Sequence, residues 1–403
     1  MKLISIPKNQ YDNYRLDVIF NCYKWDPQFL DKNTIAKHVL VISEEEHQEL
    51  KKITEMLDFE TIQAENFINK NLKIAKSLNL PKKIKKDLRK MKNYQSDKHI
   101  RLMRYDFHPT IEGNWAISEV NSDVPGGFAE ASLMPQVAIN LFKEENYEYQ
   151  NFGDIITTAI ANKIQPNKRI ILIHCTSYSD DRQVMQFLGD KLESMGFEPI
   201  YAAADHLRFK NNKAICILDG KQGSVDAIVR FTPIEWLKDI KPKYWHGYFN
   251  TETSSCNHPI AIFAQTKRFP FIWGQLEEKG IKMTTWREFL PETIEVKDVK
   301  KQTGFIYKPV YGRVGENISI KEACKDNEFE KIIKDVKKKP KKYIAQKKFN
   351  SKPLIDENNE SFHVCLGSYC IDGKSAGYYA RISQNPRIDS NAQDIPVLIE
   401  RSK

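Results

Sequence analysis

Four polar residues, Arg104, Asp106, Glu119 and Asn121, are spaced so that they could do chemistry together. They lie in the segment "RYDFHPTIEGNWAISEVN", within two runs rich in β-branched and aromatic residues, which is typical of strands. Side chains alternate along a strand, so Arg104 and Asp106 share one face, and so do Glu119 and Asn121. The sequence therefore predicts two neighbouring strands that each present two polar side chains on one face.

The residues between the two runs predict how the strands pair. Residues 112–113 form a short turn signal, and a two-residue turn would place Asp106 opposite Glu119 and Arg104 opposite Asn121. Opposed Cβ atoms lie roughly 4.5 to 5.5 Å apart, where two carboxylates repel, so a positive group is expected between them. Mg²⁺ prefers oxygen ligands and usually takes one or two carboxylates plus substrate phosphates. The hairpin is therefore a candidate Mg²⁺ site, although a longer turn would shift the pairing.

A lysine followed by a glycine-rich loop forms a second candidate site. In "FIYKPVYGRVGENISI" (305–320), Lys308 belongs to a predicted strand and precedes Gly312, Arg313 and Gly315, and a second strand is expected at "NISI". Glycines let backbone N–H groups approach phosphate oxygens, and a lysine adds charge to the same group. The pattern is not a Walker motif, because no GK[ST] opens a helix. A glycine-rich hairpin turn beside an exposed lysine is the alternative interpretation.

Single polar residues elsewhere are weaker candidates. Gln346 ends the strand-like "KKYIAQ", where its amide could meet an adenine edge, although an edge strand blunted by lysines explains the segment equally well. Arg381 follows "SAGYYA" on a late predicted strand, where a lone arginine is more often a surface charge than part of a site. Asp180 and Asp181 follow the strand "IILIHC", where they could hold an amine or could cap the next helix.

The spacing of apolar residues predicts the elements that position these side chains. The chain before the hairpin has mainly helical periodicity, with an acidic first turn behind Ser43, and 168 to about 265 alternates strand and helix as in a βαβ layer. A length of 403 residues is too long for one ordinary core. The predicted units are a helical N-terminal region, a hairpin and helix, a Rossmann-like layer and a last part of helix and strand pairs, at 1–97, 98–150, 151–265 and 266–403. The resemblance given below implies that the last part binds ATP.

Composition excludes several classes of function. No run approaches the roughly 18 to 20 apolar residues of a membrane span, and the first residues lack the apolar stretch of a signal peptide, so a cytoplasmic protein without membrane contact is expected. The seven cysteines are scattered without a CxxC pair, which predicts buried thiols rather than disulfides or zinc. A net charge of +9 comes from dispersed lysines without any nucleic-acid-binding motif. Attraction to anionic small molecules such as ATP explains the same bias.

These motifs occur together and in a recognisable order. The RxD…ExN hairpin, the α/β layer, "LPET" (290–293), "GRVGEN", "YIAQ" and "GSY…AGYYAR" resemble the glutathionylspermidine synthase-like ATP-grasp family from about residue 98 to the end. The resemblance implies a mixed α/β (α+β) ATP-grasp fold with a Rossmann-like pre-ATP-grasp layer. In most ATP-grasp enzymes the metal-binding carboxylates follow the ATP lysine. Here they precede it, and this permuted order is typical of the family.

The resemblance also implies roles for the candidate residues. The ligands of two Mg²⁺ ions would be Asp106, Glu119 and Asn121. The residues that contact ATP would be Lys308, Gly312, Arg313, Gly315 and Gln346. The arginines near the reacting carboxylate and the transferred phosphate would be Arg104 and Arg381. The implied activity is ATP-dependent amide formation from a small carboxylate and an amine through an acyl phosphate.

The sequence departs from the family at the substrate end. Relatives that act on glutathione carry small hydroxyl residues just beyond the ExN segment, where this chain has Val124 and Gly126. An amino acid or a small peptide is therefore an alternative acid substrate. A non-catalytic nucleotide-binding relative is the alternative from another class. The sequence does not indicate an oligomeric state.

Overall fold

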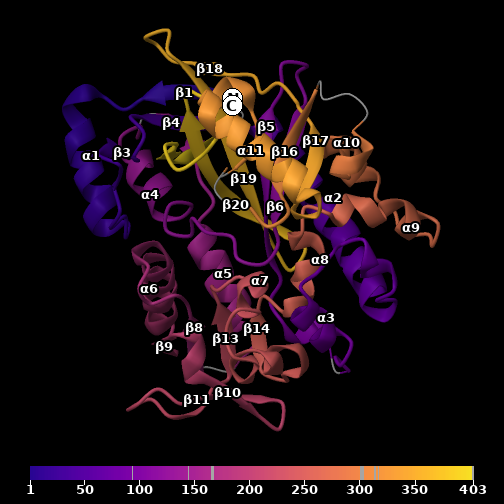
Figure 1. The fold of residues 1–403 in the computed structure, drawn as a ribbon. Coiled ribbons are helices and arrows are strands. Elements are labelled where there is room, and N and C mark those ends of the chain that lie inside the picture. The colour runs from indigo at the N-terminus through magenta and orange to yellow at the C-terminus, as the bar shows by residue number, and fades with distance from the viewer. Residues whose placement is uncertain are drawn as a thin grey trace.

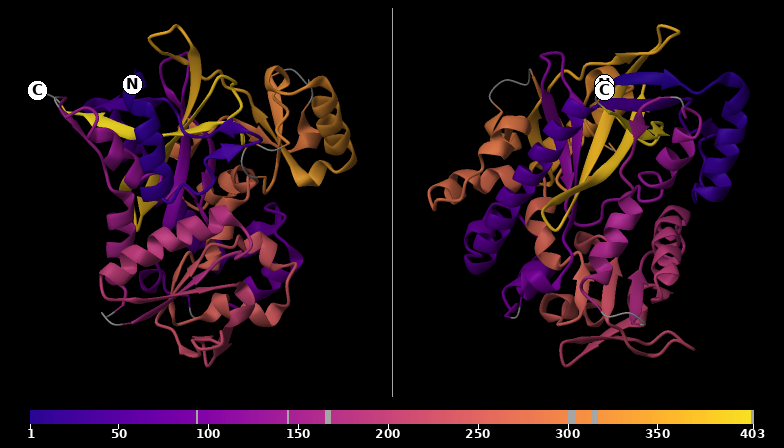
Figure 2. Two further views of the ribbon diagram at one scale, coloured as in Figure 1. Left: turned by 90° about the vertical axis from the view of Figure 1, so that its left-hand side faces the viewer. Right: turned by 180° about the vertical axis from the view of Figure 1, so that it is seen from behind.

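A computed structural model of the chain describes residues 1–92, 94–143, 145–164, 168–299, 304–312, 315 and 317–401. A central antiparallel sheet forms the upper part of the molecule and a parallel α/β layer forms the lower part (Figure 1). A small three-stranded unit with helix α11 (Asp326–Lys338) projects from the side (Figure 2). In the part of the chain that is described, no helix is long and apolar enough to cross a membrane.

The central sheet carries both predicted strands of the hairpin. Its strand order is β21-β20-β19-β5-β6, with β18 paired to β19 and every neighbour antiparallel. Its strands are β5 (Leu102–Pro109), β6 (Trp115–Asn121), β18 (Leu354–Ile355), β19 (Ser361–Ile371), β20 (Lys374–Ser383) and β21 (Gln393–Ile395). Tyr105 and Phe107 point to the buried face, and alternation sends their polar neighbours to the other face.

The long helix α2 (Glu44–Lys70) covers the buried face of the central sheet. Ser43 caps it as predicted, because its side chain accepts from the Glu46 backbone N–H and the Glu46 carboxylate accepts from the Ser43 N–H. Leu50 and Leu57 share a core with Tyr105 and Phe107. The opposite face of the sheet is thereby left for a cavity.

The α/β layer confirms the predicted βαβ pattern. Four parallel strands have the order β14-β13-β8-β9, and the apolar runs of the two central strands, β8 and β13, suit strands that are covered on both faces. The strands are β8 (Arg169–Ile173), β9 (Glu198–Ala202), β13 (Ala227–Arg230) and β14 (Ser254–Cys256). The main helices are α5 (Phe152–Ala161) and α6 (Ser179–Ser194). A small antiparallel sheet at its edge comprises β10 (Leu207–Lys210), β11 (Lys213–Cys216) and β12 (Gly223–Ser224).

The small projecting unit has a core of its own. It contains β15 (Thr293–Ile294), β16 (Phe305–Pro309), β17 (Tyr343–Lys347) and α11 (Asp326–Lys338), in the strand order β15-β17-β16. Residues Tyr307, Ile332, Val336, Tyr343 and Ala345 pack together inside it. The predicted strand at 317–320 is wrong: this segment is irregular and joins β16 through the Ser319 N–H, which donates to the Tyr307 carbonyl at 3.1 Å.

The N-terminal region is less uniformly helical than predicted. Its strands β1 (Lys2–Ser5) and β4 (His38–Ser43) join β7 (Tyr147–Glu148) and the last strand β22 (Val397–Glu400) in one sheet. Helices α1 (Lys8–Asn21) and α4 (Leu133–Ile139) pack together beside this sheet. A short hairpin follows α1, formed by β2 (Gln28–Phe29) and β3 (Lys32–Asn33). The remaining helices are α3 (Lys82–Leu88), α7 (Ile234–Leu237), α8 (Ile262–Gln265), α9 (Trp273–Glu277) and α10 (Thr284–Phe289).

Candidate active site

The hairpin of β5 and β6 has the predicted pairing but not the predicted turn. Thr110 N–H donates to the Asn114 carbonyl at 2.9 Å, so residues 111–113 form a three-residue loop, with Gly113 at φ 85°. A longer loop by itself would shift the register. A bulge in β6 at Ser118 restores it, and Asp106 pairs with Glu119.

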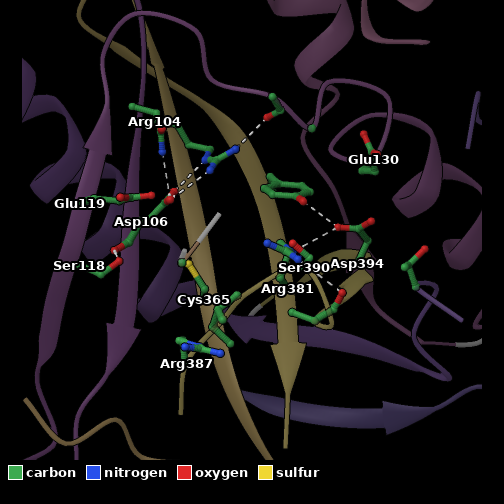
Figure 3. Close-up of a pocket in the computed structure, with 18 of the residues that line it drawn as sticks. Arg104, Asp106, Ser118, Glu119, Glu130, Cys365, Arg381, Arg387, Ser390 and Asp394 are labelled. Carbon is green, nitrogen blue, oxygen red and sulfur yellow. Dashed lines mark hydrogen bonds and ion pairs between the residues drawn. The ribbon is translucent and has the colours of Figure 1, made fainter. Parts of the chain in front are cut away.

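The pairing brings the four predicted polar residues together. Arg104 pairs with Asn121 in the ladder, and all four side chains line one cavity of about 470 Å³. Figure 3 shows Arg104, Asp106 and Glu119 along the strands at one side of this cavity. The prediction that they share a face is confirmed.

Cationic side chains lie against the two opposed carboxylates. Arg104 makes a fork to Asp106, with Nε 2.7 Å from Oδ1 and Nη2 3.0 Å from Oδ2. Lys267 Nζ lies 2.8 Å from Glu119 Oε2. The Asn121 side-chain amide donates to Asp106 Oδ2 at 3.1 Å. The expected positive charge near the carboxylates is therefore supplied by two side chains, one of them from a segment far along the chain.

The two carboxyl groups have pKa values shifted in opposite directions. Burial raises the pKa of Asp106, and Glu119 adds to this, whereas Arg104 acts against it. Burial also opposes ionisation of Glu119, but Lys267 and then Lys308 more than offset it and lower the pKa of Glu119 to about 2. We conclude that Glu119 is firmly anionic, while Asp106 depends on Arg104 to remain so.

The hairpin residues fit a hard metal ion only together with outside ligands. Within the described ranges, no group of three or more His, Cys, Asp or Glu side chains is placed to hold a metal ion. Asp106, Glu119 and Asn121 offer oxygen atoms on one face, and Mg²⁺ usually takes one or two carboxylates when phosphates complete its shell. The metal assignment therefore stays a prediction that is tied to a bound phosphate compound.

Lys308 reaches this cavity from the small unit. It lies on β16, is 3% exposed, and its Nζ donates to the Ser118 carbonyl at 2.9 Å. Burial lowers the pKa of Lys308 to about 8, although Glu119 acts in the opposite direction. A buried ammonium group that bonds to one carbonyl is a strong candidate for binding an anion, and the alternative of an exposed lysine is wrong.

Only part of the glycine-rich segment lines the cavity. Gly315 lines the cavity, and its φ of 65° together with the Ile388 carbonyl, which a Cβ at this position would clash with, leaves room only for glycine. Gly312 does not line it, but its carbonyl accepts from Lys267 Nζ at 2.7 Å. Arg313 lies outside the described residues.

Gln346 lies beside the cavity rather than in its wall. It is 2% exposed on β17, its Nε2 donates to Thr293 Oγ1 at 3.0 Å, and its Oε1 has no partner among the described residues. It lines a neighbouring small cavity that it shares with Glu119, Lys267 and Trp286. An unpartnered amide oxygen in a cavity shared with Lys267 is compatible with the predicted adenine contact, which stays a prediction.

Arg381 lies on β20 beyond Cys365 and faces the same cavity (Figure 3). Its Nη2 donates to the Asp389 carbonyl, and its Nε lies 3.8 Å from Asp394 Oδ1. Arg387, in the loop after β20, lines the same space and makes an ion pair of 2.7 Å with Glu328 on α11. This pair connects the small unit to the central sheet.

The two predicted acidic residues after β8 have different surroundings. Asp180 lines the cavity. Asp181 accepts from the Cys175 N–H at 3.3 Å, which is a structural contact at the start of α6. Val124 and Gly126, at the positions where relatives carry hydroxyls, line the cavity together with Phe231. The Gly126 carbonyl accepts from Arg104 Nη1 at 2.8 Å.

Sequence reasoning missed several residues of the site. His108 could have been found, because alternation along the strand places it on the face of Arg104 and Asp106. Burial, with a smaller effect from Lys308, lowers the pKa of His108 to about 3, and its Nε2 lies 3.0 Å from Ser118 Oγ. Lys267 lies in an irregular segment without a periodic signal, and its role depends entirely on tertiary contacts.

The fold is of the mixed α/β ATP-grasp class, and the predicted fold class is confirmed. The sequence profile described as "Glutathionylspermidine synthase preATP-grasp" matches residues 15–400, so the chain belongs to this family of ligase-type synthetases. A comparison with curated proteins found no match.

Solved structures of two proteins are similar to this chain, and the first of them shares its fold. A glutathione synthetase-like effector from Globodera pallida has a TM-score of 0.65 and 12% identity, covering 98% of this chain and 99% of its own. A provisionally named gamma-glutamylcysteine synthetase from Methylobacillus flagellatus KT has a TM-score of 0.46 and 14% identity, covering 84% of this chain and 87% of its own.

Proposed function

We propose that the chain is an ATP-dependent ligase that joins a carboxylate to an amine and releases ADP and phosphate. One observation carries the proposal: cationic side chains from the central sheet and from the small unit converge on the cavity that holds two opposed carboxylates. These cations are Arg104, Lys308, Arg381 and Arg387. Fixed positive groups around a transferring phosphoryl group stabilise the charge that spreads over its oxygens.

The residues suggest a division of roles. Lys308 would bind a phosphate of ATP, and the unpartnered Oε1 of Gln346 would accept from the adenine amino group. Arg104 and Arg381 would orient the acid and stabilise the transferred phosphoryl group. Mg²⁺ held by Asp106, Glu119 and Asn121 would neutralise phosphate charge when it is bound.

The proposed reaction has two steps. A carboxylate oxygen of the acid attacks the γ-phosphorus of ATP, and ADP leaves. The nitrogen of the neutral amine then attacks the acyl carbon, phosphate leaves, and the nitrogen loses a proton as the amide forms. Glutathione with a polyamine is one substrate pair to test, because the family name refers to it. Val124 and Gly126 support testing amino acids and small peptides as the acid.

Hydroxylamine trapping tests this function. The chain is incubated with ATP, Mg²⁺, excess hydroxylamine and one candidate acid at a time, and hydroxamate and ADP are measured together. We expect a hydroxamate from the true acid, none from a Lys308→Met variant, and full yield from Lys347→Met, a control at an exposed lysine of neighbouring β17. Phosphoryl transfer to a hydroxyl product without hydroxamate would refute the ligase reaction and indicate a kinase.

A Gly126→Ser variant adds a test of the acid. A Cβ at Gly126 would find only Phe231 Cζ, at 3.8 Å, so a serine is accommodated. If the missing hydroxyl is what excludes glutathione, this variant should form a glutathione hydroxamate in larger yield than the unaltered chain does.

A nucleotide-binding relative without catalysis is the second candidate. The observation that favours it is that Asp106 and Glu119 already have cationic partners, Arg104 and Lys267, so neither needs a metal ion for charge balance. Calorimetry with a non-hydrolysable ATP analogue and Mn²⁺ distinguishes the ligase from the non-catalytic relative. If Mn²⁺ does not raise the affinity for the analogue, and no ADP is released for any acid, the result would support the non-catalytic relative.

A further inference from the structure

A second cavity lies apart from the one that holds the hairpin residues. It has a volume of about 250 Å³, and the described residues that line it are all different from those of the larger cavity. Its walls come from α2, from the segment 94–101 before β5, and from the residues that follow β14. No step of the proposed ligase reaction uses this cavity, so its lining has to be explained separately.

A buried carboxylate in the wall of this cavity has incomplete partners. Glu65 on α2 is 2% exposed, and its Oε2 accepts from Arg101 Nη1. The same guanidinium group donates from Nε to Asp58 Oδ1 at 2.9 Å, so one cation serves two carboxylates. The other oxygen of Glu65, Oε1, has no hydrogen-bond partner among the described residues. A buried carboxylate oxygen without a partner is costly, and a donor that enters the cavity would remove this cost.

The raised pKa of Glu65 agrees with this shortage of positive charge. Burial raises the pKa of Glu65 to about 7, although Arg101 acts in the opposite direction. A second cation beside the carboxylate would stabilise its charged form.

Three rings line the same cavity and pack against one another. The ring centroid of His258 lies 4.5 Å from that of Tyr94 and 4.6 Å from that of His99. His99 Nδ1 lies 2.9 Å from Ser255 Oγ, and His258 Nδ1 accepts from the Ile260 N–H at 3.2 Å, so both imidazoles are held in place. Burial is the main cause that lowers the pKa of His99 to about 4, and it also lowers the pKa of His258. Both imidazoles are therefore neutral near pH 7 and do not repel a cation.

The charges around the cavity favour a cation over an anion. The described ionisable side chains that line it, histidine and tyrosine apart, are three carboxylates and two cations, namely Glu65, Asp97, Asp372, Arg101 and Lys163. Arg101 is also shared with a carboxylate outside the lining. Lys163 donates to the Asp97 carbonyl at 2.7 Å and lies 3.8 Å from Asp372 Oδ2, so its charge is directed towards the exposed side chains rather than towards Glu65. The remaining charge is negative.

We propose that this cavity binds a small guanidinium compound, whose N–H groups donate to Glu65 and whose plane packs against the ring of Tyr94. A guanidinium group is planar, weakly hydrated and rich in donors, and it both stacks on aromatic faces and bonds to carboxylates. The volume is below that of most drug-sized pockets, roughly 300 to 1,000 Å³, and suits such a group with a short alkyl chain. This site is separate from the ligase reaction and does not depend on it.

Saturation-transfer NMR titrations with three matched probes test the proposal. Ethylguanidinium, ethylurea and ethylammonium are added at low millimolar concentration and constant ionic strength. Ethylurea has the planar shape and the donors but no charge, and ethylammonium has the charge but is not planar. We expect ethylguanidinium to bind about tenfold or more tightly than ethylurea, since one fixed charge pair is worth about this much, and more tightly than ethylammonium.

Variants of the wall locate the bound cation. Glu65→Gln keeps an acceptor for Arg101 but removes the charge, and it should lower the affinity for ethylguanidinium to about that for ethylurea. Tyr94→Leu removes the aromatic face and should weaken binding about threefold. Asp180→Asn changes a carboxylate of the larger cavity and should leave the affinity unchanged.

A second variant keeps the test decisive if Glu65→Gln does not fold. Asn66 is half-buried on α2 and lines the cavity, so Asn66→Lys would place an ammonium group inside it and should abolish binding. Three results would overturn the proposal: ethylguanidinium binding no more tightly than ethylurea or ethylammonium, an affinity unchanged by Asn66→Lys or by a folded Glu65→Gln variant, or a loss of binding in Asp180→Asn. The last result would place the cation in the larger cavity.

Discussion

Replacing Lys308 should weaken nucleotide binding and remove part of its pH dependence. Lys308 is buried, donates to the Ser118 carbonyl, and has a pKa lowered to about 8 by burial. Lys308→Met should weaken binding of an ATP analogue by about 1.5 to 3 kcal/mol, the usual contribution of a hydrogen bond to a charged group. Lys308→Arg keeps the positive charge and should weaken binding of the analogue less.

The pH dependence follows from the lowered pKa. With a pKa of about 8, roughly nine-tenths of Lys308 is protonated near pH 7 and roughly one-tenth near pH 9. If phosphate needs the ammonium form, the dissociation constant should rise about tenfold across this interval. The Met variant, and the Arg variant with its permanent charge, should lack this change.

The same shift predicts a stability effect with a definite sign. Between about 8 and the ordinary value of 10.5, the unfolded chain binds a proton at Lys308 that the folded chain does not. The free energy of unfolding should therefore rise with pH across this window relative to Lys308→Met, by up to about 3 kcal/mol. Calorimetric titrations and urea unfolding at matched pH values measure both effects. An affinity of the Met variant equal to that of the unaltered chain at about pH 7 would refute the reasoning.

Two further predictions concern the hairpin. Asp106→Asn and Glu119→Gln should each lower Mg²⁺-dependent ATP turnover about a hundredfold or more while circular dichroism shows an unchanged fold, and normal turnover in both would disprove the metal assignment. Gly367→Ala should lower turnover about tenfold or more, because its Cβ would lie 2.7 Å from Arg104 Cδ and displace the guanidinium group. Gly274→Ala, where a Cβ meets nothing within 4 Å, is the matched control, and equal turnover in the two alanine variants would contradict this role of Arg104.

The hairpin shows how far local sequence signals reach. Alternation along the strands correctly predicted which side chains share a face, because that periodicity follows from strand geometry alone. The two-residue turn was wrong, yet the predicted pairing of Asp106 with Glu119 is present because the bulge at Ser118 compensates for the third loop residue. Bulges depend on the neighbouring strands and contacts, so this pairing was predicted correctly for an incomplete reason.

Residues that reach the site from irregular segments could not be predicted in this way. Lys24 precedes a short hairpin and Lys267 lies between two short helices, and neither position has a periodic pattern or a recognised motif. Their roles come from long-range contacts with Asp394 and Glu119. A charge is informative only once its partners are known, which local sequence cannot supply.

The contacts of Lys267 and Lys308 imply that nucleotide and carboxylate sites are coupled. Lys267 Nζ contacts both Glu119 and the Gly312 carbonyl, and Lys308 bonds to the carbonyl of Ser118, the residue before Glu119. Both lysines therefore connect the small unit to one short stretch of β6. Any cation that binds Glu119 must compete with Lys267, and any phosphate that attracts these lysines weakens their hold on β6. The charge balance at Glu119 thus depends on whether phosphate is present, and we therefore expect the proposed metal ion and nucleotide to bind here together more readily than either alone.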